Sequence, residues 1–119
     1  MQFILLFTEP ASEAAVHAHP IEGPKLMGAW RDYIGSMMQA GVMLNGDGLQ
    51  PPATATTVKV RGGAREVQDG PYCKAKEYLG GYVTLEVDDL DAAIKWAEQS
   101  PAALSGSVEI RPVMMNATG

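Results

Sequence analysis

The heptapeptide QFILLFT, residues 2–8, decides the fold, because five consecutive apolar residues lie inside it. In an extended strand, alternate side chains point to opposite faces of the sheet. One face then holds Phe3, Leu5 and Phe7, and the other holds Ile4 and Leu6. A strand that is apolar on both faces is typical of the middle of a sheet covered on both sides. Helices can cover one side, and we expect a second copy of the chain to cover the other.

Two helices are predicted by the spacing of apolar residues. Between Pro24 and Gly41 these residues recur every three or four positions, as on one face of a helix. They are Leu26, Met27, Trp30, Tyr33, Ile34, Met37 and Met38. We expect this stripe to belong to the core. A second helix is expected to begin at Asp88 or Asp89, either of which can cap it, and to exit at Pro101.

The other strands are expected where apolar and polar residues alternate. They lie at the start of 42–52 and over 54–60, 65–68, 81–87 and 107–115. RGGA, residues 61–64, predicts a two-residue hairpin turn, because glycine tolerates the positive φ that such turns need. Residues 9–23 are rich in Pro, Gly and Ala and are expected to form a loop. Asn45 and Asp47, in the sequence NGDG, are expected in a turn.

The order of these elements predicts the fold class. It reads β-α-β, then a β-hairpin, then β-α-β, and right-handed crossovers place both helices on one face of one sheet. This is an α+β, ferredoxin-like βαβ-β-ββαβ-type sandwich with an antiparallel sheet. The face without helices would be covered if two sheets packed together, so we expect a homodimer, a dimeric α/β barrel. At 119 residues, we expect 1–119 to be a single domain.

Composition narrows the classes of function. The net charge is -5 and the nine basic residues are scattered, which argues against nucleic acid as a partner. Cys73 is the single cysteine, so no intrachain disulfide is expected. No apolar run approaches the roughly 18 residues of a membrane helix, and the first residues lack the basic start of a signal peptide. We therefore expect a soluble, cytoplasmic protein with no membrane or nucleic-acid partner.

Several motifs together resemble one known family. DGPY and KE, then LGGY, DLDAAIKWA and VEIRPV, resemble the YCII-related family in its DGPF-type branch. GAWRDYI, AGV and GDGLQPP, followed by TATTVKV, are similar to that branch as well. The resemblance runs over residues 2–114 and implies the dimeric α/β-barrel fold. It also implies a YCII-related, DGPF-type domain over the whole chain.

The resemblance implies less about chemistry. Most of the family has no assigned function, but an aspartate and a histidine are proposed as a catalytic pair in YCII-like members. One member is a dehydrochlorinase of a hydroxylated aromatic ring. Genes of the branch often lie beside sigma-factor genes, which implies a regulatory context. This chain departs from the branch at Tyr72, Cys73 and Lys74, where Phe, a small residue and an acidic residue are usual.

The stretch VQDGPYCKAKEYLGGY, residues 67–82, supplies most site candidates. Asp69 either completes a turn with the Gly and Pro that follow it or is a carboxylate held at a strand end for acid–base work, and both stay open. Tyr72 and Tyr82 are candidates for a pocket wall. Lys76 can hold an anionic group, and Glu77 can pair with a base; the alternative is a solvated charge pair. The two glycines of LGGY are expected to permit a bulge or a close backbone approach.

Four further candidates come from outside this stretch. His17 and His19, in the sequence HAH, can act as a general base beside Asp69; exposed loop histidines are the alternative. A metal site would need a third ligand that no spacing selects, so no metal is predicted. Asp47 is added as a substrate-binding candidate, because a strand end brings it near the same cleft. Trp30 is added as well, with membership of the core as the alternative.

Two classes of function stay open at this point. The first is an enzyme without a cofactor that acts on a small polar or aromatic metabolite by proton transfer, as in elimination or isomerisation. No phosphate loop, nucleophile triad or metal set points elsewhere. The alternative is a non-enzymatic dimeric module that binds a ligand or a regulatory protein. A scaffold without any pocket is the third possibility.

Overall fold

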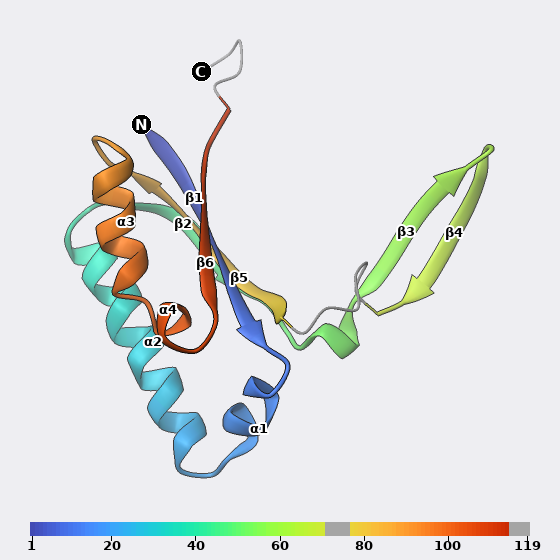
Figure 1. Ribbon diagram of the computed structural model, residues 1–119, viewed down its shortest axis with the longest axis horizontal. Helices are drawn as coiled ribbons and strands as arrows, with labels where there is room; N and C mark the ends of the chain where they lie inside the picture. The colour runs from blue at the N-terminus through green and yellow to red at the C-terminus, as the bar shows by residue number, and fades with distance from the viewer. Residues whose placement is uncertain (71–76, 115–119) are drawn as a thin grey trace.

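A four-stranded antiparallel sheet forms the centre of the protein. The computed structural model describes residues 1–70 and 77–114. The strands lie in the order β2-β5-β1-β6 (Figure 1). Their bounds are Gln2–Pro10 for β1, Met43–Gly48 for β2, Glu77–Glu86 for β5 and Ser107–Pro112 for β6. β1 pairs with β5 on one side and β6 on the other, so the central position predicted from its apolar run is confirmed.

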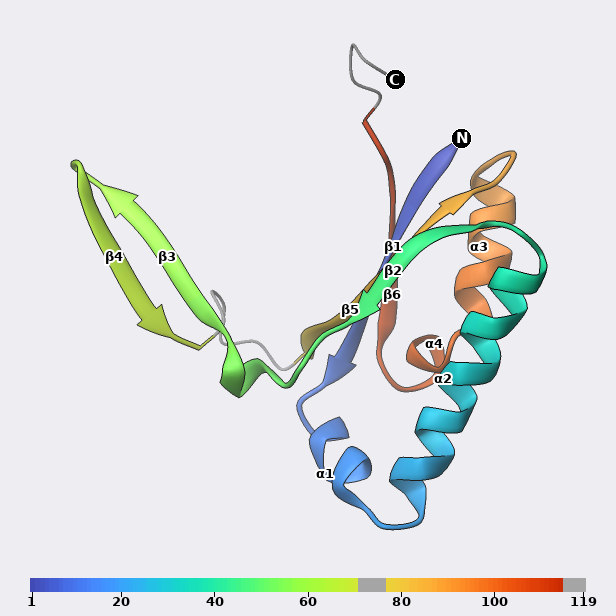
Figure 2. The ribbon, with the colours of Figure 1, turned by 180° about the vertical axis from the view of Figure 1, so that it is seen from behind.

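The helices gather on one face of this sheet (Figure 2). The two longer ones are α2, Glu22–Gln39, and α3, Leu90–Glu98; the shorter ones are α1, Glu13–Ala18, and α4, Pro101–Ser105. The α+β, ferredoxin-like arrangement expected from the sequence is therefore confirmed. Asp89 caps α3 as predicted, because its side chain accepts a hydrogen bond of 2.9 Å from the backbone N–H of Ala92.

The core fills the space between the sheet and the helices. Its largest fully buried side chains include Phe3, Leu5, Met37, Val83 and Leu85. Three aromatic rings, of Phe7, Trp30 and Tyr33, meet edge to face with centroids 5.0 to 6.1 Å apart. The Tyr33 hydroxyl donates a 2.8 Å hydrogen bond to the carbonyl of Trp96, and burial raises the pKa of this phenol far above its ordinary value.

The second sheet is a separate hairpin that projects from the body (Figure 1). Its strands are β3, Thr56–Arg61, and β4, Ala64–Asp69, and a single 3₁₀ turn, Pro52–Thr54, precedes them. Gly62 and Gly63 have φ of 59° and 78°, so the predicted glycine turn is confirmed. The radius of gyration is 16.2 Å. A compact chain of this length would have about 13.5 Å, and the projecting hairpin accounts for the excess.

Two local predictions are wrong. Residues 9–23 are not simply a loop, because α1 and the start of α2 lie within them. Helix α1 forms because three of its six residues are alanines, the strongest helix formers, and Glu13 in its first turn is buried. Asn45 and Asp47 lie in strand β2 and not in a turn. Gly46, between them, lets β2 approach β5, since a Cβ there would lie 2.6 Å from the Tyr82 carbonyl oxygen.

Only part of the apolar stripe on α2 is buried against the sheet. Tyr33 and Met37 are buried as predicted, and Trp30 is half-buried. Met27 and Met38, however, are 51% and 66% exposed, so the prediction that the whole stripe is core is only partly right. A helix that buries one narrow line of side chains on a sheet leaves the flanking positions at the edge.

Two leucines offer a matched test of where the stability resides. Leu5 is fully buried at the centre of the sheet, whereas Leu104 on α4 is 90% exposed. Leu5→Ala should lower the free energy of unfolding by about 2–5 kcal/mol, because it removes buried methyl groups and leaves a cavity. Leu104→Ala should change it by less than about 0.5 kcal/mol. Urea unfolding followed by circular dichroism measures both, and equal effects would contradict this core.

Candidate functional site

The candidate site lies where β1 ends and β5 begins. The register between these strands shifts there: Phe7 pairs with Gly81, whereas Thr8 pairs with Leu79. Gly80 is therefore an extra residue in β5, a β-bulge. The expectation that the two glycines of LGGY permit a bulge and a close approach is confirmed. A Cβ on Gly81 would lie 2.9 Å from the carbonyl oxygen of Asp47.

The bulge makes room for a carboxylate. A Cβ on Gly80 would collide with the side chain of Glu9, so Glu9 occupies the place where any other residue would put its side chain. The Glu9 side chain is only 26% exposed. Its Oε2 lies 3.1 Å from Nε2 of His17, which comes from the last turn of α1. Strand β1 and helix α1 thus hold a histidine–carboxylate pair against the backbone of β5.

This pair has the chemistry of an oriented base. An ionised carboxylate accepts hydrogen bonds only, so a His17 ring in its neutral form would donate the Nε2–H to Glu9 in this contact. Its Nδ1 would then carry the free lone pair. The side chain of His17 is 36% exposed. A fixed histidine with one ring nitrogen held by a carboxylate is an arrangement that proton-transfer enzymes use.

An apolar hollow lies at the start of β5, between that strand and the segment that follows β2. It has a volume of about 360 Å³. Its wall includes Leu49, Pro51, Pro52, Tyr78 and Leu79. Tyr78 is directly opposite Glu9 in the pairing of β1 with β5, and side chains at such positions are neighbours. Tyr78 therefore connects the hollow with the histidine–carboxylate pair.

A second polar pair lies on the face of the sheet that has no helices. Tyr82 and Asp47 are directly opposite each other on β5 and β2, and the tyrosine hydroxyl donates a 3.0 Å hydrogen bond to Oδ2 of Asp47. This hydrogen bond, together with the negative charge of Asp47, raises the pKa of Tyr82 above 10.0. Both residues were predicted to line a pocket, and the structure brings them together.

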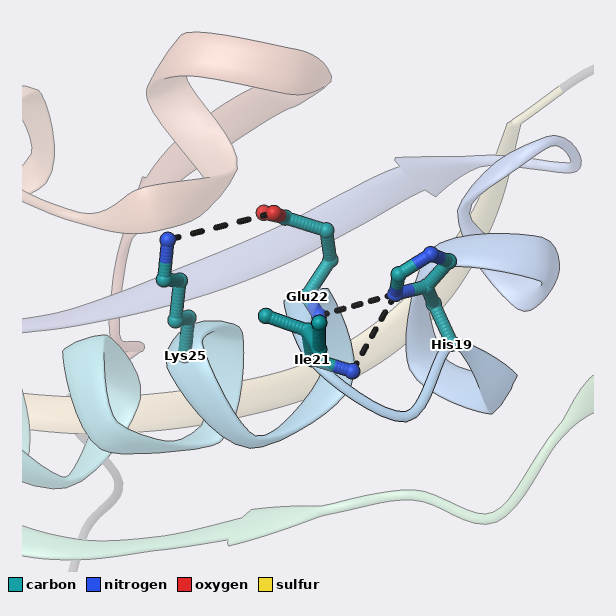
Figure 3. A network of polar contacts seen from close by, with 4 residues as sticks. All are labelled: His19, Ile21, Glu22 and Lys25. Carbon is teal, nitrogen blue, oxygen red and sulfur yellow. Dashed lines mark hydrogen bonds and ion pairs between the residues drawn. The ribbon is translucent and has the colours of Figure 1, made fainter.

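His19 has a different role from His17 (Figure 3). Its Nδ1 accepts hydrogen bonds from the backbone N–H groups of Ile21 and Glu22, at 3.1 and 3.0 Å. These N–H groups begin helix α2 and have no partner within the helix. Glu22 also lies 3.9 Å from Lys25, an exposed ion pair one turn along the helix. The His19 ring thus caps α2.

The other predicted site residues are spread over the chain. Asp69 ends β4 on the hairpin, and within residues 1–70 and 77–114 it makes no hydrogen bond or ion pair with either histidine. Glu77 begins β5, exposed and opposite Pro10. Trp30 packs on Phe7. The candidates that lie outside the described residues are Tyr72 and Lys76, together with Cys73 and Lys74. The described part of the chain holds no cluster of three metal-ligating side chains.

Sequence reasoning missed Glu9, Tyr78 and the Leu49–Pro52 wall of the hollow. One feature of the sequence could have indicated Glu9. It is an acidic residue near the end of an apolar strand, eight residues before His17, and the two side chains can meet if the chain folds back between them. The turn of α1 provides that return. Nothing in the sequence marks Tyr78 above the other tyrosines, since its importance depends on the register at the bulge.

Comparisons with known proteins identify the family. A family model described as "YCII-related domain" matches residues 1–116, so the chain belongs to the YCII-related family. An uncharacterized protein of Rhizobium meliloti (strain 1021) is 33% identical over 73 residues, which cover 60% of this chain and 59% of that protein. The match thus spans less than two thirds of that relative.

One solved structure is similar along its whole length. It is the 5-chloro-2-hydroxyhydroquinone dehydrochlorinase TftG of Burkholderia phenoliruptrix AC1100, in complex with 2,5-dihydroxybenzoquinone. The TM-score is 0.57 with 13% sequence identity, and the match covers 99% of this chain and 98% of that one. At this identity the likeness supports the fold.

Within the described residues, no helix is long and apolar enough to cross a membrane.

The Tyr82–Asp47 pair makes a prediction about alkaline pH. Because the pKa of Tyr82 is raised in the folded state, its hydrogen bond stabilises the fold below pH 10.0 and is lost as the pH rises through the raised value. Asp47→Asn should lower this pKa toward 10.0, since the charge that opposes the phenolate is gone. Absorbance at 295 nm, compared with Tyr82→Phe, reports the titration. Asp32→Asn, at an exposed aspartate on α2, is the control, and an unchanged titration in Asp47→Asn would contradict the pair.

Proposed function

We propose that the chain is an enzyme without a cofactor, in which His17 is the general base and Glu9 orients it. The observation that carries the proposal is the 3.1 Å contact between His17 Nε2 and Glu9 Oε2. Tyr78, which is opposite Glu9 in the sheet, also lines the apolar hollow. The sequence suggested an aspartate as the acid–base group with a histidine as its helper. In the proposal the histidine takes the leading role and a glutamate supports it.

The substrate class follows from the surroundings of the pair. A hollow whose wall includes two prolines, two leucines and a tyrosine suits the flat or apolar body of a small molecule. His17 would remove a proton from the part of the substrate that reaches the pair. In an elimination the electron pair of the broken bond expels the leaving group; in an isomerisation it shifts a double bond, and His17 returns the proton at another atom. Elimination and isomerisation are reactions of this kind.

The similar fold suggests which compounds to try first. TftG is described as a dehydrochlorinase and was solved with a dihydroxybenzoquinone bound. Hydroxylated and halogenated hydroquinones and quinones are therefore a rational set of probes for this chain. Their flat six-membered rings match the hollow, and the hydroxylated members carry acidic O–H protons for the base.

Substitutions of His17 and Glu9 test the proposal. With any compound of the set that the wild type converts, His17→Asn should lower kcat/KM by about 10²–10⁴-fold, because the general base is lost. Glu9→Gln should cause a smaller loss, since it keeps the shape but removes the charge that orients the ring. Liquid chromatography of the products measures turnover.

His19→Asn is the matched control for this experiment. Asparagine can cap α2 in place of the ring, so fold and turnover should both be kept. Equal activity of His17→Asn and the wild type would overturn the proposal. Equal losses in His17→Asn and His19→Asn would also overturn it, because they would point to a shared structural effect.

We also propose that two copies pair through the open face of the sheet. The register gives two rows across that face, Asp47–Tyr82–Leu6–Glu109 and Asn45–Thr84–Ile4–Arg111. Their centre is apolar and half-buried within one chain, while the rim is polar, as in many interfaces between subunits. In such a homodimer the Tyr82–Asp47 pair would lie in the shared interior.

The sheet contact is tested by placing a charge at its centre. Leu6→Lys should convert a dimer into a monomer, because a lysine buried between two sheets has no partner there. Leu104→Lys, at a leucine that is 90% exposed on the helical side, should leave the dimer intact. Sedimentation equilibrium measures the mass of each. A dimer that survives Leu6→Lys would contradict pairing through this face.

A non-enzymatic module is the second candidate function, and one observation favours it. Helix α2 has a shallow apolar hollow of about 390 Å³ that is lined by Met27, Trp30, Ile34 and Met38 with Arg31 at its edge. Flexible methionines around a tryptophan are suited to binding another protein. The family's sigma-factor context gives this alternative a regulatory setting. Inactive wild-type protein across the whole compound set would favour it.

The remaining expectations belong to the same proposal. We assign the chain to the DGPF-type branch, as one domain over 1–119 and in the cytoplasm. Asp69, Tyr72, Lys76 and Glu77 stay predicted contributors to substrate binding or catalysis, through the segment that enters β5. Their individual substitution by Ala, read by the same assay, measures what each adds.

A further inference from the structure

The β3–β4 hairpin, residues 56–69, presents its apolar side to solvent. Val58, Val60 and Val67 share one face and are 54–60% exposed. On the opposite face Thr57 and Lys59 of β3 are half-buried, whereas their β4 partners Gln68 and Glu66 are exposed. An apolar side that faces solvent is the reverse of what a hairpin on the surface of a protein normally shows. We call residues 56–69 the arm and its apolar side the valine face.

An arm of this kind needs a partner. Its two strands form a sheet of their own, and a lone two-stranded hairpin is marginally stable in water. At its base it is tied by two hydrogen bonds, from Gly70 N–H to the Ala55 carbonyl and from the Thr57 hydroxyl to the Gly70 carbonyl. These bonds hold the base but leave the valine face uncovered.

The charges on the valine face identify a partner. Three cross-strand pairs lie along it: Thr56–Asp69 at the base, Val58–Val67 in the middle and Val60–Arg65 near the tip. The base of the face is therefore negative and the tip is positive. If a second arm lies against the first in the reverse direction, Asp69 meets the partner's Arg65, and the valines meet in the middle. A surface that complements itself in this way fits a two-fold axis.

We propose that the arm pairs with the same arm of a second copy of this chain, valine face to valine face and in opposite directions. A stable interface usually buries at least about 1,200 Å² in total, which two such short hairpins do not supply alone. The arm contact therefore adds to a larger contact between copies. The proposal does not depend on which face supplies that contact.

A chemical cross-link tests the geometry directly. Facing sheets lie about 10 Å apart, which a short bismaleimide spans. In a Cys73→Ser background, Val67→Cys should cross-link two chains, because the two copies of this position meet at the axis. The matched control is Gln68→Cys, at the neighbouring position on the opposite face, which should not cross-link. Equal cross-linking of the two variants would overturn the proposal.

A charge exchange tests the partner's identity. Asp69→Arg or Arg65→Asp alone places like charges opposite each other twice across the axis, and each should weaken association by at least about tenfold in sedimentation velocity. The double exchange should restore association to near the wild-type value. If the double exchange stays weak, or if neither single change weakens association, arm-to-arm pairing is wrong.

The two proposed contacts between copies can fail separately. Leu6→Lys tests pairing through the open face of the sheet, and the charge exchange between Asp69 and Arg65 tests pairing through the arm. Circular dichroism and urea unfolding of each variant show that the body remains folded, which is expected because the arm adds no side chain to the core.

Discussion

The β-bulge at Gly80 is the constraint on which the candidate site depends. It shifts the register of β1 against β5 and opens the space that the Glu9 carboxylate fills. A side chain at the bulge position would fill the space of the Glu9 carboxylate, and His17 on α1 would lose this partner. A single inserted residue in β5 thus leaves space for the Glu9 carboxylate beside His17.

The same sheet serves two purposes on its two faces. The helical face buries Phe3, Leu5 and Phe7 and provides the stability. The open face keeps a polar rim around Ile4 and Leu6, with the Tyr82–Asp47 hydrogen bond at one side. Because one strand contributes to both faces and also ends at Glu9, the core, the proposed interface between copies and the candidate base are linked through β1.

Patterns that depend on local sequence were predictable. The apolar run of β1 places it in the middle of the sheet, Asp89 caps α3, and the two glycines after Arg61 turn the hairpin. Features that depend on tertiary contacts were not. Helix α1 has only six residues and no visible period, and the use of His19 as a cap follows from where α2 begins.

The candidate site illustrates the same limit. His17 and His19 were both predicted as a base beside Asp69, which belongs to the DGPY motif. The structure instead pairs His17 with Glu9, because a bulge and a short helix bring together residues that no motif connects. Family membership supports the fold without deciding between these pairs, since the similar dehydrochlorinase structure shares 13% of its residues with this chain.

The most direct measurement of the central claim is a long-range ¹H–¹⁵N spectrum of the two histidine rings, assigned with His17→Asn and His19→Asn. At a pH where both rings are neutral, His17 should show one fixed tautomer with the proton on Nε2, and Glu9→Gln should weaken that preference. A His17 ring that averages between tautomers as a free histidine does, and does not respond to Glu9→Gln, would contradict an oriented base at this site.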